Sequence, residues 1–140
     1  MSDSVTTAIN FIQSQFAAIP GIRAAPNEPL DKIDPFPCVL TFEQSGTVDL
    51  EEPYSSSYGP QTAVIVSELH IQRTDLPRNI RQAMTFREAM LRVIMNNPNL
   101  GNAVIVAKRA RWTLGPMNWN GIDTIGYKFE IDLQLELSPG

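Results

Sequence analysis

The sequence predicts an α+β fold: one mainly antiparallel sheet with two main helices packed on one face and a long C-terminal β-hairpin. Three observations lead to this prediction. Apolar residues recur at helical spacing in two segments, they alternate with polar residues in several others, and the expected order is helix, strand, loop, strand, helix, strand, strand. The 140 residues are close to the usual size of one domain, so we expect residues 1–140 to form a single domain.

The first helix is expected over residues 4–18. The apolar residues that recur there at steps of four, three and four are Val5, Ile9, Ile12 and Phe16. Ser4 precedes them as a candidate cap, and Pro20-Gly21 ends the helix. Residues 20–37 hold five of the eleven prolines and show no sustained periodicity. We expect an extended connection that follows the surface.

Two strands are expected in the middle of the chain, over residues 38–44 and 61–73. The first begins at Cys38, which we expect to be a small core side chain. The second is apolar on both faces in its first half, so that end should be covered on both sides. Its other half carries His70 on the more polar face, as a surface or interface residue. The polar residues 45–60 predict a loop or two short strands.

The second helix is expected from Asp75-Leu76-Pro77, since proline is tolerated in a first turn, to about residue 96. Its apolar set is broad and comprises Ile80, Ala83, Met84, Met90, Leu91 and Ile94. At 100° per residue, Arg87 falls in the middle of this face. Two interpretations are open: its stem lies along the apolar face and exposes the guanidinium, or the guanidinium reaches a carboxylate of a neighbouring chain.

The C-terminal hairpin is the strongest pattern, with strands expected over residues 102–114 and 123–137. Apolar residues alternate without a fault from Ile125 to Leu137, which indicates one buried and one wet face. Asn120-Gly121 suits the positive φ of a tight turn within the linking residues 115–121. Opposite charges across the two strands should help to set the register, with Lys108, Arg109 and Arg111 beside Glu130 and Asp132.

The two tryptophans lie on either side of this turn. Trp112 shares its face with apolar neighbours and is expected in the core. Trp119 is expected at the exposed tip with Met117, where a large ring and a thioether are typical of an interface anchor. An unused surface ring is the alternative for Trp119.

The net charge of −4 is unevenly distributed along the chain. Residues 1–72 carry nine acids and two bases, residues 73–111 carry eight bases and two acids, and residues 112–140 carry four acids and one base. One interpretation is that each charged face is simply solvated. The other is that an acidic surface of one copy meets a basic surface of the next, a head-to-tail contact that closes into a ring when the rotation permits. The candidate interface residues are Arg78, Arg81, Arg87, Met117 and Trp119.

Residues that perform chemistry are scarce. One cysteine excludes an intrachain disulfide, one histidine leaves too few ligands for an ordinary zinc site, and no nucleotide-binding or metalloprotease motif is present. We predict no enzyme, no catalytic residues, no metal and no cofactor. No apolar run approaches the ~18 residues of a membrane helix, and the start of the chain lacks the pattern of a secretion signal. A pI near 4.9 does not favour non-specific nucleic-acid binding.

Several local patterns, together with the order of the elements, resemble the tail terminator proteins of long-tailed bacteriophages over most of the chain. These patterns are the amphipathic N-terminal helix, the helix start Asp75-Leu76-Pro77, the closing hairpin, and the run Tyr58-Gly59-Pro60-Gln61-Thr62-Ala63-Val64-Ile65-Val66 leading to Leu69-His70-Ile71-Gln72-Arg73.

The resemblance implies a small subunit without catalysis or cofactor that assembles, typically as a hexameric ring, at the head-proximal end of the tail tube. There it stops tube polymerisation and presents a surface to neck or head-completion proteins. The expected location is the virion, after assembly in the host cytoplasm. Genomic DNA would pass through the ring without specific binding, and an acidic wall suits this passage because like charges repel. The candidate wall residues are Glu51, Glu52, Glu130 and Asp132.

Other functions remain open at this point. A different head–tail connector or a tail tube subunit would show the same general sequence features. Of these, the tube subunit should form long polymers. A host-derived binding module would stay monomeric. A hydrolase or transferase would require a pocket that contains His70 or Cys38.

Overall fold

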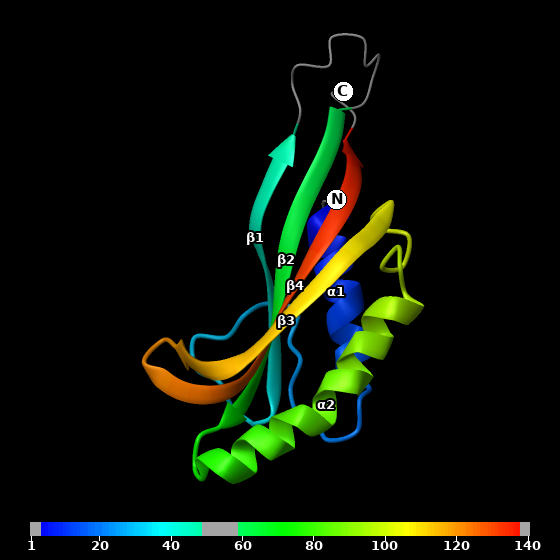
Figure 1. The fold of residues 1–140 in the computed structure, drawn as a ribbon. Helices are drawn as coiled ribbons and strands as arrows, with labels where there is room; N and C mark the ends of the chain where they lie inside the picture. Colours follow the sequence, from blue (N-terminus) through cyan, green and yellow to red (C-terminus); the bar gives the residue numbers. More distant parts are fainter. Residues whose placement is uncertain (1–3, 49–58, 138–140) are drawn as a thin grey trace.

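The computed structural model describes residues 4–48 and 59–137, which form two helices and one four-stranded antiparallel sheet (Figure 1). The helices are α1 (Ser4–Ala17) and α2 (Leu76–Asn96). The strands are β1 (Cys38–Val48), β2 (Gly59–Gln72), β3 (Val106–Trp119) and β4 (Ile122–Leu137), in the order β1-β2-β4-β3. The predicted α+β fold is confirmed.

One face of the sheet carries the main core. From Ile125 to Leu135, every second side chain of β4 is buried, as the alternation predicts, and the buried side chains of both helices join the same cluster. A polar network lies within this packing. Thr41 donates its hydroxyl to the Gln13 side-chain oxygen at 2.6 Å and lies 2.8 Å from the Ser67 hydroxyl, while Gln13 donates to the Val39 carbonyl. Because each of these buried groups has a partner, the network fixes α1 on β1 without an unsatisfied polar atom.

The opposite face carries a second, smaller core at one end of the sheet. The connection between α1 and β1 consists of turns, bends and one bridge residue, and it covers this face. Ile33 packs there against Cys38 and Leu40. Ala24 forms a parallel bridge with Cys38. Cys38 is a buried core side chain, as predicted, and this burial raises the pKa of its thiol to about 11.

The strands next to the 45–60 segment differ from the predicted bounds. β1 continues to Val48 and β2 begins at Gly59, so a loop over the whole of residues 45–60 is wrong. Residues 49–58, with Glu51 and Glu52, lie outside the described residues.

The hairpin is also shifted along the chain. β3 begins at residue 106 rather than 102, because a turn occupies the residues before it. Leu100, Gly101 and Asn102 adopt positive φ values of 48°, 70° and 68°, and the amides of residues 103 and 104 donate to the Asn99 carbonyl. The strand then runs to Trp119 and leaves only Asn120-Gly121 as the turn, with φ values of 51° and 87°. Pro116 is tolerated inside β3 because this is an edge strand with a free side.

Candidate functional site

Helix α2 carries two adjacent stripes, one buried and one partly exposed. The buried stripe consists of Asn79, Ala83, Phe86, Met90 and Ile94. The stripe one residue further on, here called the outer stripe, consists of Ile80, Met84, Arg87, Leu91 and Met95. Met84 is 55% exposed and Met95 is 74% exposed. The predicted apolar face is confirmed for Ala83, Met90 and Ile94, which are buried, and for Ile80 and Leu91, which pack against the core. It is wrong for Met84, which lies outside the core, and it omitted Phe86, which lies inside it.

Arg87 belongs to the outer stripe, so its place among apolar residues no longer conflicts with its charge. Its guanidinium carbon lies 5.8 Å from the centroid of the Trp112 ring, a distance typical of a cation–π contact. Trp112 is 45% exposed, so its predicted place in the core is wrong. The reason is that α2 packs against β2 and β4, while Trp112 lies beyond them on the edge strand β3.

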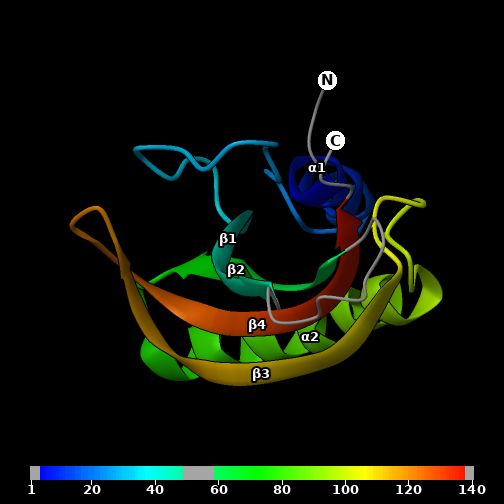
Figure 2. The same ribbon diagram turned by 90° about the horizontal axis from the view of Figure 1, so that it is seen from above.

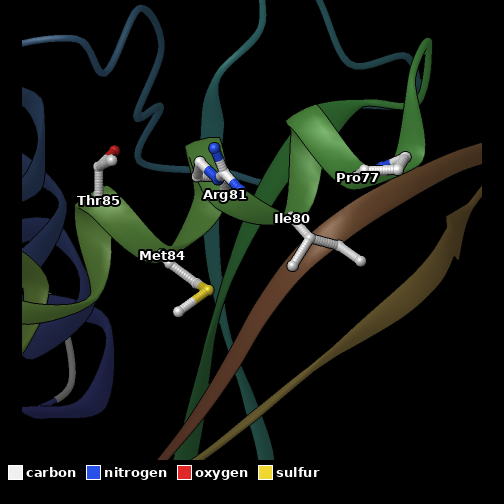
Figure 3. Close-up of a pocket in the computed structure, with 5 residues that line it drawn as sticks. All are labelled: Pro77, Ile80, Arg81, Met84 and Thr85. Atoms are coloured by element: carbon white, nitrogen blue, oxygen red, sulfur yellow. The ribbon is translucent and has the colours of Figure 1, made fainter.

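A shallow hollow of about 490 Å³ opens on the outer side of α2, here called the α2 hollow. It is lined by Pro77, Ile80, Arg81, Met84 and Thr85 (Figure 3). Ile80 and Met84 point to one side of the helix and Arg81 and Thr85 to the other. Two of the predicted interface residues, Arg78 and Arg81, are exposed and have no ion-pair partner among the described residues.

Trp119 was predicted to be an interface anchor at the exposed tip of the hairpin, and the structure does not leave it exposed there. Its ring packs within the monomer against Phe42 and His70, at centroid distances of 5.8 and 5.9 Å. Its indole nitrogen donates a hydrogen bond to the Leu30 carbonyl at 2.6 Å. The expectation that Trp119 is hard to bury at an exposed tip is therefore wrong. The turn lies against residues 30–31, and Met117 is half-buried beside it. The apolar residues of the 20–37 connection were the sequence feature that could have predicted a partner for the Trp119 ring.

The same contacts hold an acidic loop in place. Residues 27–34, here called the acidic loop, carry Glu28, Asp31 and Asp34, all exposed and without an ion-pair partner in the described part of the chain. Asn120 donates its side-chain amide to the Asp31 carbonyl at 2.9 Å, next to the bond from Trp119. Figure 2 shows this light-blue segment and α2 on opposite sides of the sheet.

His70 is fully buried, so its predicted surface position is wrong. Its Nδ1 lies 2.6 Å from the Thr124 hydroxyl and its Nε2 lies 2.9 Å from a Glu68 carboxylate oxygen. Carboxylate, imidazole and hydroxyl follow one another as in a nucleophilic triad, but His70 and Thr124 are both inaccessible. The hollows beside α2, between α1 and β1, and at Arg109 are lined by neither His70 nor Cys38. The pocket that a hydrolase would require is not among them.

Glu130 and Asp132 are paired with arginines of the neighbouring strand. Arg111 contacts Glu130 at 3.0 Å and Asp132 at 3.3 Å, and Arg109 contacts Asp132 at 3.2 Å. The predicted cross-strand pairing of charges is confirmed for Arg109 and Arg111, whereas Lys108 falls at the register shift between Ala107 and Arg109. The hydrogen bond to Glu130 and the charge of Asp132 raise the pKa of Arg111 above its ordinary value. The charges of these two acids are thus neutralised within the subunit. The pairing therefore speaks against the prediction that they line an acidic wall.

In the described ranges, no group of three histidine, cysteine, aspartate or glutamate side chains is placed to hold a metal ion. None of the helices built from those residues has the length and apolar character needed to cross a membrane. No family model matches the chain, and no curated protein matches it.

Proposed function

We propose that this chain is a structural protein of a bacteriophage virion, similar to the tail terminator proteins, that forms a ring at the head-proximal end of the tail tube. There it stops tube polymerisation and joins the tail to the neck or head. Its partners in this role are further copies of itself, the tail tube protein and a neck or head-completion protein, and genomic DNA passes through the ring without specific binding. No bond is made or broken.

The observation that carries the proposal is the outer face of α2 together with the adjoining side of β3. Exposed apolar side chains gather there around Met84 and Trp112, and arginines stand between and beside them. Exposed apolar surface rimmed by polar groups is typical of a protein interaction site, and arginine is enriched at such sites. The resemblance of the sequence then supplies the kind of assembly: a closed ring on a tube.

A second candidate, a tail tube subunit or another head–tail connector, is favoured by the sheet edges. β1 and β3 are both long edge strands. Near their first residues Val39 donates to the Ala24 carbonyl and Ala107 to the Pro98 carbonyl, and edges of this kind can pair with neighbouring copies along the rest of their length. Pairing that repeats without closing would give a long polymer rather than a ring.

Native mass spectrometry and negative-stain images of the purified chain test the proposal. A tail terminator should give closed rings of one defined mass. Long tubes would favour the tube subunit instead. A chain that stays monomeric up to about 1 mM, a concentration at which even weak contacts form, would overturn both candidates.

A further inference from the structure

We propose that the acidic loop of one copy docks into the α2 hollow of the next copy. This inference rests on the proposed function, since it assumes self-association, and it names the two surfaces that meet. The occupant of the hollow is thus a second copy of this chain, inserted through residues 27–34.

The charges of the two surfaces are complementary. The loop presents Glu28, Asp31 and Asp34 with the single base Lys32, and the three acids have no ion-pair partner in the region described. On the surface of α2, Arg81 lines the hollow, and Arg78 lies one helical turn before it. Complementary potentials of this kind steer association and fix its register.

The apolar side chains of the two surfaces also suit one another. The hollow is shallow, with apolar side chains from Pro77, Ile80 and Met84. The loop carries the exposed Pro29 and the half-buried Leu30 between its acids. An apolar centre with charged groups at its margin is the usual arrangement of a protein interface.

Contacts within the subunit anchor the loop to the sheet and to the hairpin turn. Trp119 donates to the Leu30 carbonyl and Asn120 to the Asp31 carbonyl, while Ile33 is buried against β1. Because these contacts use backbone carbonyls and the Ile33 side chain, the carboxylates of the loop stay free to bind a neighbouring copy. A segment ordered in advance loses less entropy when it binds. Trp119 therefore serves the contact by positioning the loop.

The two surfaces lie on opposite faces of the sheet. Ile33 packs on the face that carries Cys38 and Leu40, whereas α2 packs on the main core (Figure 2). A chain therefore cannot fill its own hollow with its own loop. A contact between two different surfaces is heterologous, and it generates a closed ring or an open filament.

Charge reversal tests the contact. Asp31→Arg and Arg81→Asp, made separately, should each weaken self-association of the full chain by about tenfold or more, because like charges would then meet. An equimolar mixture of the two variants should assemble again. Residues 31 and 81 are both arginine in the first variant and both aspartate in the second, so only alternating neighbours bring opposite charges together at these two positions. Native mass spectrometry would show equal numbers of the two masses in each particle.

Arg92→Asp is the matched control, because Arg92 is an exposed arginine of the same helix that does not line the hollow. It should assemble as the unchanged chain does. If the unchanged chain forms rings but both reversals leave them intact, or the mixture of folded variants fails to recover, the contact is wrong while the proposed function stands. If the unchanged chain never self-associates, the proposed function fails, and the contact fails with it.

Discussion

The guanidinium carbon of Arg87 lies 5.8 Å from the centroid of the Trp112 ring. The contact joins α2 to the edge strand β3 across the part of the sheet that the helix does not cover. Both partners remain exposed, so an incoming subunit would meet an arginine already oriented by a flat apolar ring. This pair therefore belongs to the surface proposed for assembly. A variant that lacks the contact allows the effect on stability and the effect on self-association to be measured separately.

Arg87→Ala should lower self-association more than it lowers stability. An exposed cation–π contact contributes only about 0.5–1 kcal/mol to folding, whereas an arginine in an interface can contribute more than 2 kcal/mol to binding. Urea unfolding and native mass spectrometry measure the two effects on the same preparation. Arg92→Ala, which removes an exposed arginine from the outside of the same helix, is the control. A less stable monomer with an unchanged oligomer would retire Arg87 as an interface residue.

Salt should weaken the assembly if opposite charges join the subunits. The screening length falls from about 10 Å at 0.1 M salt to about 3 Å at 1 M, so exposed pairs such as those expected at Arg81 lose most of their attraction. Sedimentation velocity across this range should show the ring giving way to smaller species. An assembly indifferent to salt would indicate that apolar contacts, such as those of Met84, hold it together.

Gly126→Ala should destabilise the sheet strongly, by about 3 kcal/mol, because an added Cβ would collide with the backbone carbonyl of Leu69 on the neighbouring strand. Its cross-strand partner Gly115 is the matched control. A Cβ on Gly115 meets nothing within 4 Å, so Gly115→Ala should stay within about 0.5 kcal/mol of the unchanged chain. Equilibrium urea unfolding of both variants checks the difference, and equal stabilities would contradict the close approach of β2 and β4.

Cys38 should resist alkylation in the folded chain. Burial raises the pKa of its thiol from 9.0 to about 11, which at pH 8 leaves on the order of a hundredfold less thiolate than in the unfolded chain. Labelling with iodoacetamide, with and without urea, measures this protection. Equal labelling rates in the two conditions would contradict the burial of Cys38.

The same shift has a consequence for stability. A raised pKa in the folded state gives a contribution that is complete below pH 9 and is lost as the pH rises toward 11. The free energy of unfolding should therefore fall over this range, and the fall should be smaller in Cys38→Ala. Identical pH profiles for the two chains would show that the thiol titrates alike in both states.

The sequence alone determined the features that depend on neighbours along the chain. The alternation in β4 predicted its buried face, the spacing of Ile12 and Phe16 predicted α1, and Asn120-Gly121 predicted the hairpin turn, because each pattern expresses a local backbone geometry. The charges of β3 and β4 predicted their pairing for the same reason, since a turn between two strands brings them together.

Only the tertiary structure decided which parts of each face are covered. Trp112 is exposed instead of buried, Trp119 is half-buried instead of standing at an exposed tip, and His70 is buried instead of exposed, because distant segments cross the sheet at particular places. α2 packs mainly on β4 and β2 and reaches β3 through Arg87, so Trp112 stays exposed, whereas the 20–37 connection returns over Trp119. Burial is a property of the surface that another segment removes from water. A pattern within one strand specifies which side chains share a face, and it carries no information on where the covering segment lies.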